Sequence, residues 1–129
     1  MKAEELMIDD WVYNHESNQY QRVWQLDYDN VVLDGYYSYD YNDIEPIPLT
    51  PEILEKNGWT YNDEDEKFAP QTWVGGGLML QDADDCGYCI VVTSDWDDED
   101  TNNTPFYILY VHELQHALRL CGIKKEIVL

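Results

Sequence analysis

The stretch from Leu109 to Gly122 constrains the fold most strongly, because it is the clearest helix in the sequence. Apolar residues recur in it three and four positions apart, which places them in one stripe along a helix. They are Val111, Leu114, Ala117, Leu118 and Cys121. Gly122 suits the left-handed backbone conformation that ends many helices, and Arg119 complements the negative end of the helix dipole. The pattern predicts a helix over about residues 109–121 with its stripe facing a core.

The same stretch contains His112-Glu113-Leu114-Gln115-His116, which matches the H-E-x-x-H pattern of zinc peptidases. Both histidines fall on one helix face, one turn apart, as two zinc ligands must. A zinc-dependent hydrolase would use His112 and His116 as ligands and Glu113 as the general base. The extended metzincin pattern, however, requires Gly and His where this chain has Arg119 and Gly122.

A catalytic zinc needs a third protein ligand, and only His15 or one of the many upstream carboxylates could supply it. The histidine face lies opposite the apolar stripe and also carries Arg119, so we expect it to face solvent. We therefore predict two exposed, chemically idle histidines and assign no catalytic residue, no metal ligand and no cofactor. On this prediction, His116→Ala should change stability by no more than about 0.5 kcal/mol.

The composition indicates a folded protein with an extreme negative charge. Its 129 residues, 44% of them apolar, suit a single domain with one core. The chain has 27 acidic and 7 basic residues, a net charge of −20, which excludes nucleic acid and anionic membranes as partners and favours basic proteins or cations. No apolar run is long enough to span a membrane, no signal peptide is seen, and three cysteines suit a reducing cytoplasm.

The order of turn signals and alternating segments predicts an α+β fold made mainly of antiparallel strands. Residues 1–49 form a β-rich N-terminal portion, either a meander or an SH3-like barrel. Thr50 and Pro51 then begin a linking helix over about residues 50–58. Residues 59–129 contain further strands, the C-terminal helix and a short terminal strand over residues 126–129.

Three other motifs leave alternatives open. Cys86 and Cys89 have the C-x-x-C spacing of redox and zinc sites, with Cys121 as a further ligand, but they precede a β-branched strand rather than a helix. The glycines of residues 75–77 lack the pattern of a phosphate-binding loop and predict a turn or bulge. The acidic residues 95–103 resemble a calcium loop in ligand density but lack its glycine and its final glutamate, so a hairpin or weak divalent-ion binding is expected.

Three segments carry a family resemblance: Lys2-Ala3-Glu4-Glu5-Leu6, residues 44–50 with the helix that follows, and Tyr110-Val111-His112-Glu113-Leu114-Gln115. Together they cover about a third of the chain, and it resembles in them a group of small uncharacterised proteins of gut bacteria and their prophages. In that group Asn commonly replaces His116 and Gln often replaces Glu113. The resemblance therefore implies no peptidase activity, only an origin in phages or mobile elements.

Three functions of different classes follow from these patterns. The first, which we favour, is a non-enzymatic cytoplasmic accessory protein that binds another protein through an acidic, aromatic-rich surface. The second is the H-E-x-x-H zinc hydrolase. The third is a DNA mimic, whose carboxylates imitate phosphates and occupy the basic cleft of a nucleic-acid-binding protein.

Overall fold

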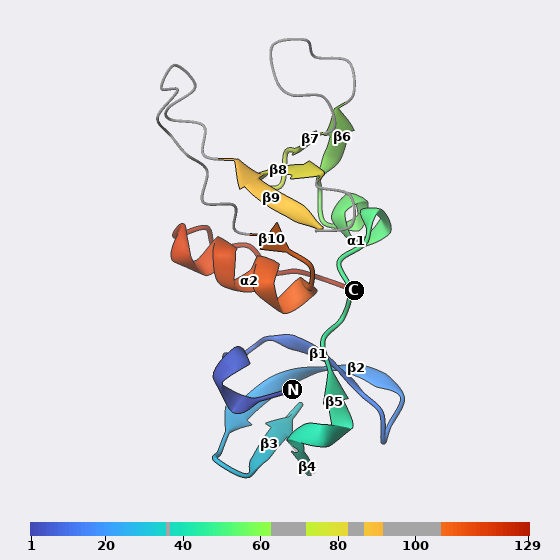
Figure 1. Cartoon of the computed structure of the whole chain (residues 1–129), viewed down its shortest axis with the longest axis vertical. Helices are drawn as coiled ribbons and strands as arrows, with labels where there is room; N and C mark the ends of the chain where they lie inside the picture. The colour runs from blue at the N-terminus through green and yellow to red at the C-terminus, as the bar shows by residue number, and fades with distance from the viewer. Residues whose placement is uncertain (36, 63–71, 83–86, 92–106) are drawn as a thin grey trace. The chain divides into compact units, whose positions relative to one another are not determined.

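The computed structural model describes residues 1–35, 37–62, 72–82, 87–91 and 107–129 (Figure 1). Its contacts group the chain into two compact units. The N-terminal unit consists of Met1–Pro48 and Tyr110–Ala117, and the C-terminal unit of Leu49–Leu109 and Leu118–Leu129. The division after Pro48 falls beside the boundary that the sequence predicts. That the whole chain forms a single domain stays a prediction.

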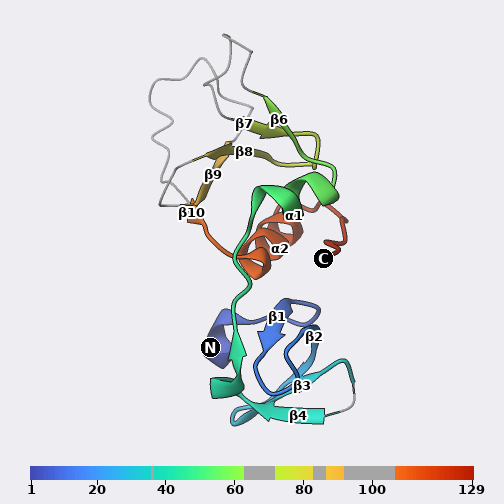
Figure 2. The same cartoon turned by 90° about the vertical axis from the view of Figure 1, so that its right-hand side faces the viewer.

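The N-terminal unit contains a five-stranded antiparallel sheet that curls into a half-barrel (Figure 2). Its first four strands are neighbours in chain order, as in a meander, and the fifth returns to pair with the first. The strands are β1 (Trp11–Asn14), β2 (Gln19–Leu26), β3 (Asn30–Leu33), β4 (Tyr37–Asp40) and β5 (Ile44–Glu45). Two 3-10 helices, η1 (Ala3–Glu5) and η2 (Tyr41–Asp43), complete the segment.

The concave face of this sheet carries the core of the N-terminal unit. Successive side chains of a strand point to opposite faces, so the apolar residues at alternate positions of β1, β2 and β3 share one face. The buried core residues are Leu6, Val12, Val23, Val31, Leu33, Tyr41 and Ile44. The side chains at the positions between them lie on the opposite, outer face of the sheet.

The C-terminal unit contains a second antiparallel sheet, in the order β10-β9-β8-β7-β6. Its strands are β6 (Thr60–Asn62), β7 (Thr72–Val74), β8 (Met79–Asp82), β9 (Tyr88–Val91) and β10 (Tyr107–Ile108). The predicted glycine turn joins β7 to β8, where Gly75 and Gly77 have positive φ. Gly76 lies against the ring of Trp59, which is buried and donates from Nε1 to the Leu78 carbonyl at 2.8 Å.

Both predicted helices are present. Helix α1 (Pro51–Lys56) begins as the sequence predicts, with Pro51 in its first turn and the Thr50 hydroxyl accepting from the Ile53 N–H at 3.3 Å. Helix α2 (Val111–Leu120) ends before Gly122, which has a φ of 72°. Neither described helix has the length and apolar character needed to cross a bilayer. In the described residues, α1 and α2 together with two antiparallel sheets confirm the α+β prediction.

The predicted terminal strand over residues 126–129 is wrong, because these residues form no ladder with any described strand. The side chain of Asn57 replaces a strand partner there. Its amide donates to the Val128 carbonyl and its carbonyl accepts from the Val128 N–H, both at 2.8 Å. A strand pattern in a short segment specifies an extended backbone but not which group pairs with it.

Candidate functional site

Helix α2 begins with a cap made by the glutamate of the H-E-x-x-H sequence. Glu113 is the third residue of the helix, and its Oε1 accepts from the Tyr110 N–H at 3.1 Å. This is the return contact of a capping box, which satisfies a backbone donor that the helix itself cannot pair. The Val111 N–H donates to the Ile47 carbonyl at 2.9 Å. Glu113 thus has a structural role that accounts for an acid at this position.

The second histidine contacts a buried carboxylate. His116 Nε2 lies 2.6 Å from Asp10 Oδ2, and Asp10 has no exposed surface. The same oxygen accepts from the Met7 N–H at 2.8 Å. A buried carboxylate is stable only when hydrogen bonds or opposite charge compensate for its lost hydration. His116, whose side chain is 24% exposed, therefore joins α2 to the segment that enters β1.

Gln115 lies between the two histidines in the sequence and binds the neighbouring backbone. Its Oε1 accepts from the Trp11 N–H at 2.9 Å, and its Nε2 donates to the Asp9 carbonyl at 3.0 Å. The Gln115 side chain thus accepts from one backbone group and donates to another just before and at the start of β1, as a neighbouring strand does. The Asn57 side chain binds the backbone of Val128 in the same way. Because Gln115 is buried, both hydrogen bonds are shielded from water.

The first histidine is also buried, 5% exposed, and its ring is parallel to that of Tyr110, with centroids 5.9 Å apart. Its ring meets that of His116 edge-on, with centroids at 5.5 Å. Among the described residues, no hydrogen-bond partner is found for His112 Nδ1. Burial lowers the pKa of His112 below its ordinary value of 6.5, and the charges of Asp10 and Glu113 act in the opposite direction. The fold thus favours the neutral imidazole.

The prediction that His112 and His116 face solvent is wrong. The sequence assigns the polar side of an amphipathic helix to water, and here that side is covered. His116 contacts the Asp10 carboxylate and Gln115 binds the backbone at Trp11, so these two side chains form hydrogen bonds to the protein and not only to water. Helical periodicity cannot distinguish a solvated polar face from one that is buried and paired. The expectation that His116→Ala is nearly neutral assumed a solvent-exposed side chain, and the contact with Asp10 removes that assumption.

The sequence offers further candidate ligands outside the H-E-x-x-H motif. His15 pairs with Glu45, its Nε2 2.8 Å from Oε1. Cys89 lies in β9, and Cys121 is exposed after α2. Cys86 and residues 95–103 lie outside the described residues. In the part of the chain that the structure describes, no three or more His, Cys, Asp or Glu side chains form a group able to hold a metal ion.

The outer face of β1 and β2 gathers aromatic residues into rows. The strand register places Tyr13 opposite Tyr20 and Trp11 opposite Arg22, and residues opposite each other share a face. Trp24 follows two positions after Arg22, at a bulge in the pairing of β2 with β3. We call Trp11, Tyr13, Tyr20 and Trp24 the aromatic ladder.

One ring of the ladder contacts a cation of this chain, the side chain of Arg22. The Arg22 guanidinium carbon lies 4.7 Å from the centroid of the Trp11 ring, within the range of a cation–π contact. In the neighbouring row the rings of Tyr13 and Tyr20 meet edge-on at 5.9 Å. At the far end Trp24 packs on the β3–β4 turn, where a β-carbon on Gly35 would lie 3.5 Å from its Cδ2. The outer rings remain accessible, with Tyr20 53% and Trp24 64% exposed.

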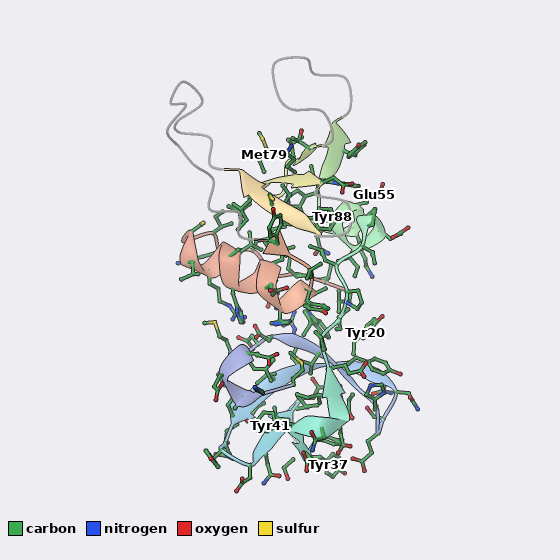
Figure 3. All side chains as sticks on the ribbon, in the orientation of Figure 1. Tyr20, Tyr37, Tyr41, Glu55, Met79 and Tyr88 are labelled. Atoms are coloured by element: carbon green, nitrogen blue, oxygen red, sulfur yellow. The ribbon has the colours of Figure 1, made fainter. Side chains whose placement is uncertain are left out.

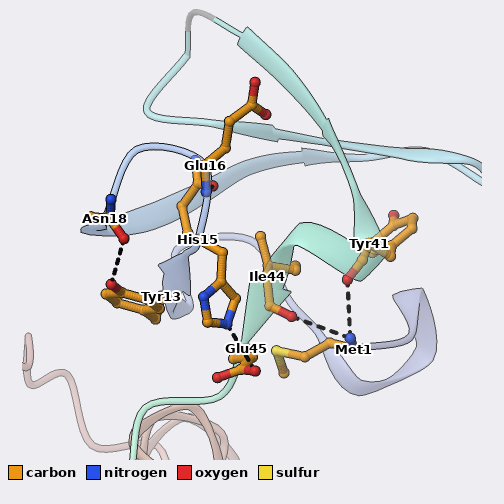
Figure 4. A network of polar contacts seen from close by, with 9 residues as sticks. Met1, Tyr13, His15, Glu16, Asn18, Tyr41, Ile44 and Glu45 are labelled. Atoms are coloured by element: carbon orange, nitrogen blue, oxygen red, sulfur yellow. Dashed lines mark hydrogen bonds and ion pairs between the residues drawn. The ribbon is translucent and has the colours of Figure 1, made fainter.

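Carboxylates flank the ladder. Glu45 lies opposite Tyr13 in the pairing of β1 with β5, and it also binds His15, whose ring meets Tyr13 edge-on (Figure 4). On the other side of β2, Asp34 Oδ1 accepts from the Arg22 N–H at 3.0 Å. Residues 1–48 contain eleven carboxylates and two basic side chains, a net charge of −9. The ladder is therefore an aromatic surface in a negative field.

Sequence reasoning missed the residues that define both sites. Asp10 and Gln115 show no local signal, because their partners lie more than one hundred positions away. The ladder does have a local signal in the sequence. A hairpin with its turn after Asn14 pairs Tyr13 with Tyr20 and Trp11 with Arg22. Comparison of the chain with protein-family models, curated proteins and solved structures finds no match. The functional argument therefore rests on this chain's own geometry.

Proposed function

We propose that this chain is a non-enzymatic protein that binds a basic protein partner through the acidic, aromatic surface of its N-terminal unit. The observation that carries the proposal is where exposed aromatics lie. Tyr20, Trp24, Tyr28 and Tyr37 are all more than half exposed, and all belong to the N-terminal sheet or its turns. Figure 3 labels two of them, Tyr20 and Tyr37. Aromatic residues are enriched in protein interfaces, where they contribute large contact areas.

Charge supports a basic partner. Residues 1–48, which expose these rings, have a net charge of −9, which accelerates the approach of a positively charged protein and disfavours nucleic acid. The structural roles of Glu113, His116 and Asp10 support a non-enzymatic function, because they explain the H-E-x-x-H sequence by folding alone. The odd number of cysteines fits activity in a reducing cytoplasm, and the resemblance to proteins of gut bacteria favours a bacterial partner.

The test is capture of partners from a bacterial lysate at about 50 mM salt, followed by affinity measurements with the purified partner up to about 500 mM. Two variants match each other in charge. The first neutralises Glu16, Asp29 and Glu45 in the N-terminal unit, and the second neutralises the exposed acids Glu52, Glu55 and Glu126 in the C-terminal unit.

We expect basic partners whose association weakens steeply with salt and is slowed by about ten-fold in the first variant only. Partners that bind equally at all salt concentrations and equally to both variants would refute the proposal. Partners that are nucleic-acid-binding proteins, displaced by duplex DNA, would identify the chain as a DNA mimic.

A further inference from the structure

We propose that the aromatic ladder binds an extended segment of the partner that carries two cationic side chains four residues apart, with arginine preferred over lysine. This inference rests on the proposed function and specifies its surface and the chemistry of its partner. The two accessible rings, Tyr20 and Trp24, lie on the same face of one strand. They are four positions apart in β2, which in a regular strand is about 13 Å.

An extended peptide has the same repeat as the strand beneath it. Its side chains at positions i and i+4 share a face and lie about 13 Å apart, so they match the two rings. Side chains at i and i+3 point to opposite faces, so only one of them can reach the ladder. The spacing of the two cationic side chains thus distinguishes binding to the ladder from attraction by net charge alone.

The row between the two rings shows the geometry of the contact. Arg22 lies over Trp11 with its guanidinium carbon 4.7 Å from the ring centroid. A partner arginine over Tyr20 or Trp24 would repeat this arrangement between chains. A planar guanidinium stacks on an aromatic face better than an ammonium group does, which is the reason for the preference. The carboxylates of Asp34 and Glu45 beside the ladder add long-range attraction.

The experiment titrates the full chain with defined peptides and follows tryptophan fluorescence. The first peptide has two arginines at i and i+4 among serines, the second has them at i and i+3, and the third has citrulline in place of both arginines. Citrulline keeps the shape and hydrogen bonds of the side chain but has no charge. We expect the first peptide to bind most tightly and the citrulline peptide least tightly.

Variants of the chain locate the contact. Tyr20→Ala and Trp24→Ala should each weaken the first peptide by about two- to five-fold, and the double variant by about ten-fold. Trp24→Leu should weaken binding of the first peptide as much as Trp24→Ala does, because an apolar side chain without an aromatic ring offers no cation–π contact. The control is Tyr107→Ala, because Tyr107 is 44% exposed in β10 of the C-terminal unit and belongs neither to the ladder nor to the N-terminal surface. Circular dichroism confirms that each variant is folded.

The outcomes separate this inference from the proposed function. If the arginine peptides bind in a salt-dependent way but equally to the Tyr20, Trp24 and Tyr107 variants, the ladder is not their site and only the proposed function survives. If no peptide binds at low salt, or if citrulline binds as well as arginine, the cationic occupant is refuted. If the chain forms a dimer and Trp24→Ala makes it monomeric, the ladder binds a second copy of this chain and the proposed peptide ligand is refuted.

Discussion

The buried contact between His116 and Asp10 gives the sharpest test of the structure. His116→Ala removes a hydrogen-bonded partner at 2.6 Å from a carboxylate with no exposed surface. A hydrogen bond to a charged group contributes about 1.5–3 kcal/mol, and breaking a fully buried ion pair costs about 3–5 kcal/mol. Because the His116 side chain is 24% exposed, water can partly replace it, and we expect a loss of about 2–3 kcal/mol.

The chain provides a matched control in the same unit. His15 and Glu45 form a pair of the same type at 2.8 Å, but their side chains are 47% and 61% exposed. His15→Ala should therefore cost less than about 1 kcal/mol, as for other exposed pairs. The two substitutions differ mainly in burial, so the difference between them measures what burial adds.

The assay is urea denaturation near neutral pH, followed by tryptophan fluorescence and circular dichroism. A double-mutant cycle with Asp10→Asn and His116→Ala isolates the energy that couples the two side chains, and we expect about 1–3 kcal/mol. The reasoning is refuted if His116→Ala costs no more than His15→Ala, or if the coupling energy is close to zero. Either result would restore the expectation of an idle surface histidine.

Four further predictions follow from buried contacts. Gln115→Ala should lower the free energy of unfolding by about 2–3 kcal/mol in the same assay, because the buried Gln115 side chain makes two hydrogen bonds, with the Trp11 N–H and the Asp9 carbonyl. Folding lowers the pKa of His112, so the free energy of unfolding should fall as the pH drops below about 6.5, by at most about 1.4 kcal/mol per pH unit for this group. His112→Gln should make the free energy of unfolding depend less steeply on pH. An unchanged pH dependence in this variant would contradict the prediction. Gly76→Ala would place a β-carbon 1.9 Å from Trp59 and should cost about 3 kcal/mol, whereas Gly122→Ala, with no atom within 4 Å, should cost only the strain of its positive φ, about 1 kcal/mol; equal losses would show that the Trp59 ring can move aside. Leu114→Ala should cost about 2–5 kcal/mol, as for other buried leucines, and a loss below about 1 kcal/mol would mean that the α2 stripe is not in a core.

The local elements of the fold were predictable because their signals are local. Thr50 and Pro51 begin α1 as a cap and a first-turn proline do, and the apolar spacing of Val111 and Leu114 predicts α2. Turn signals and alternating segments predict a β-rich portion over residues 1–49, and strands β1 to β5 lie within it. Each of these decisions depends on neighbours within a few positions of the chain.

Only the tertiary structure decided what the polar residues do. The sequence around His116 states that two histidines share a helix face, but whether that face meets water, zinc or protein depends on what packs against it. Here Asp10, more than one hundred positions away in the sequence, packs against that face and contacts His116. Within the H-E-x-x-H sequence, Glu113 caps the helix and His116 binds a buried carboxylate. Likewise the aromatic ladder exists only once the β1–β2 register pairs Tyr13 with Tyr20, because strand pairing determines which side chains share a face.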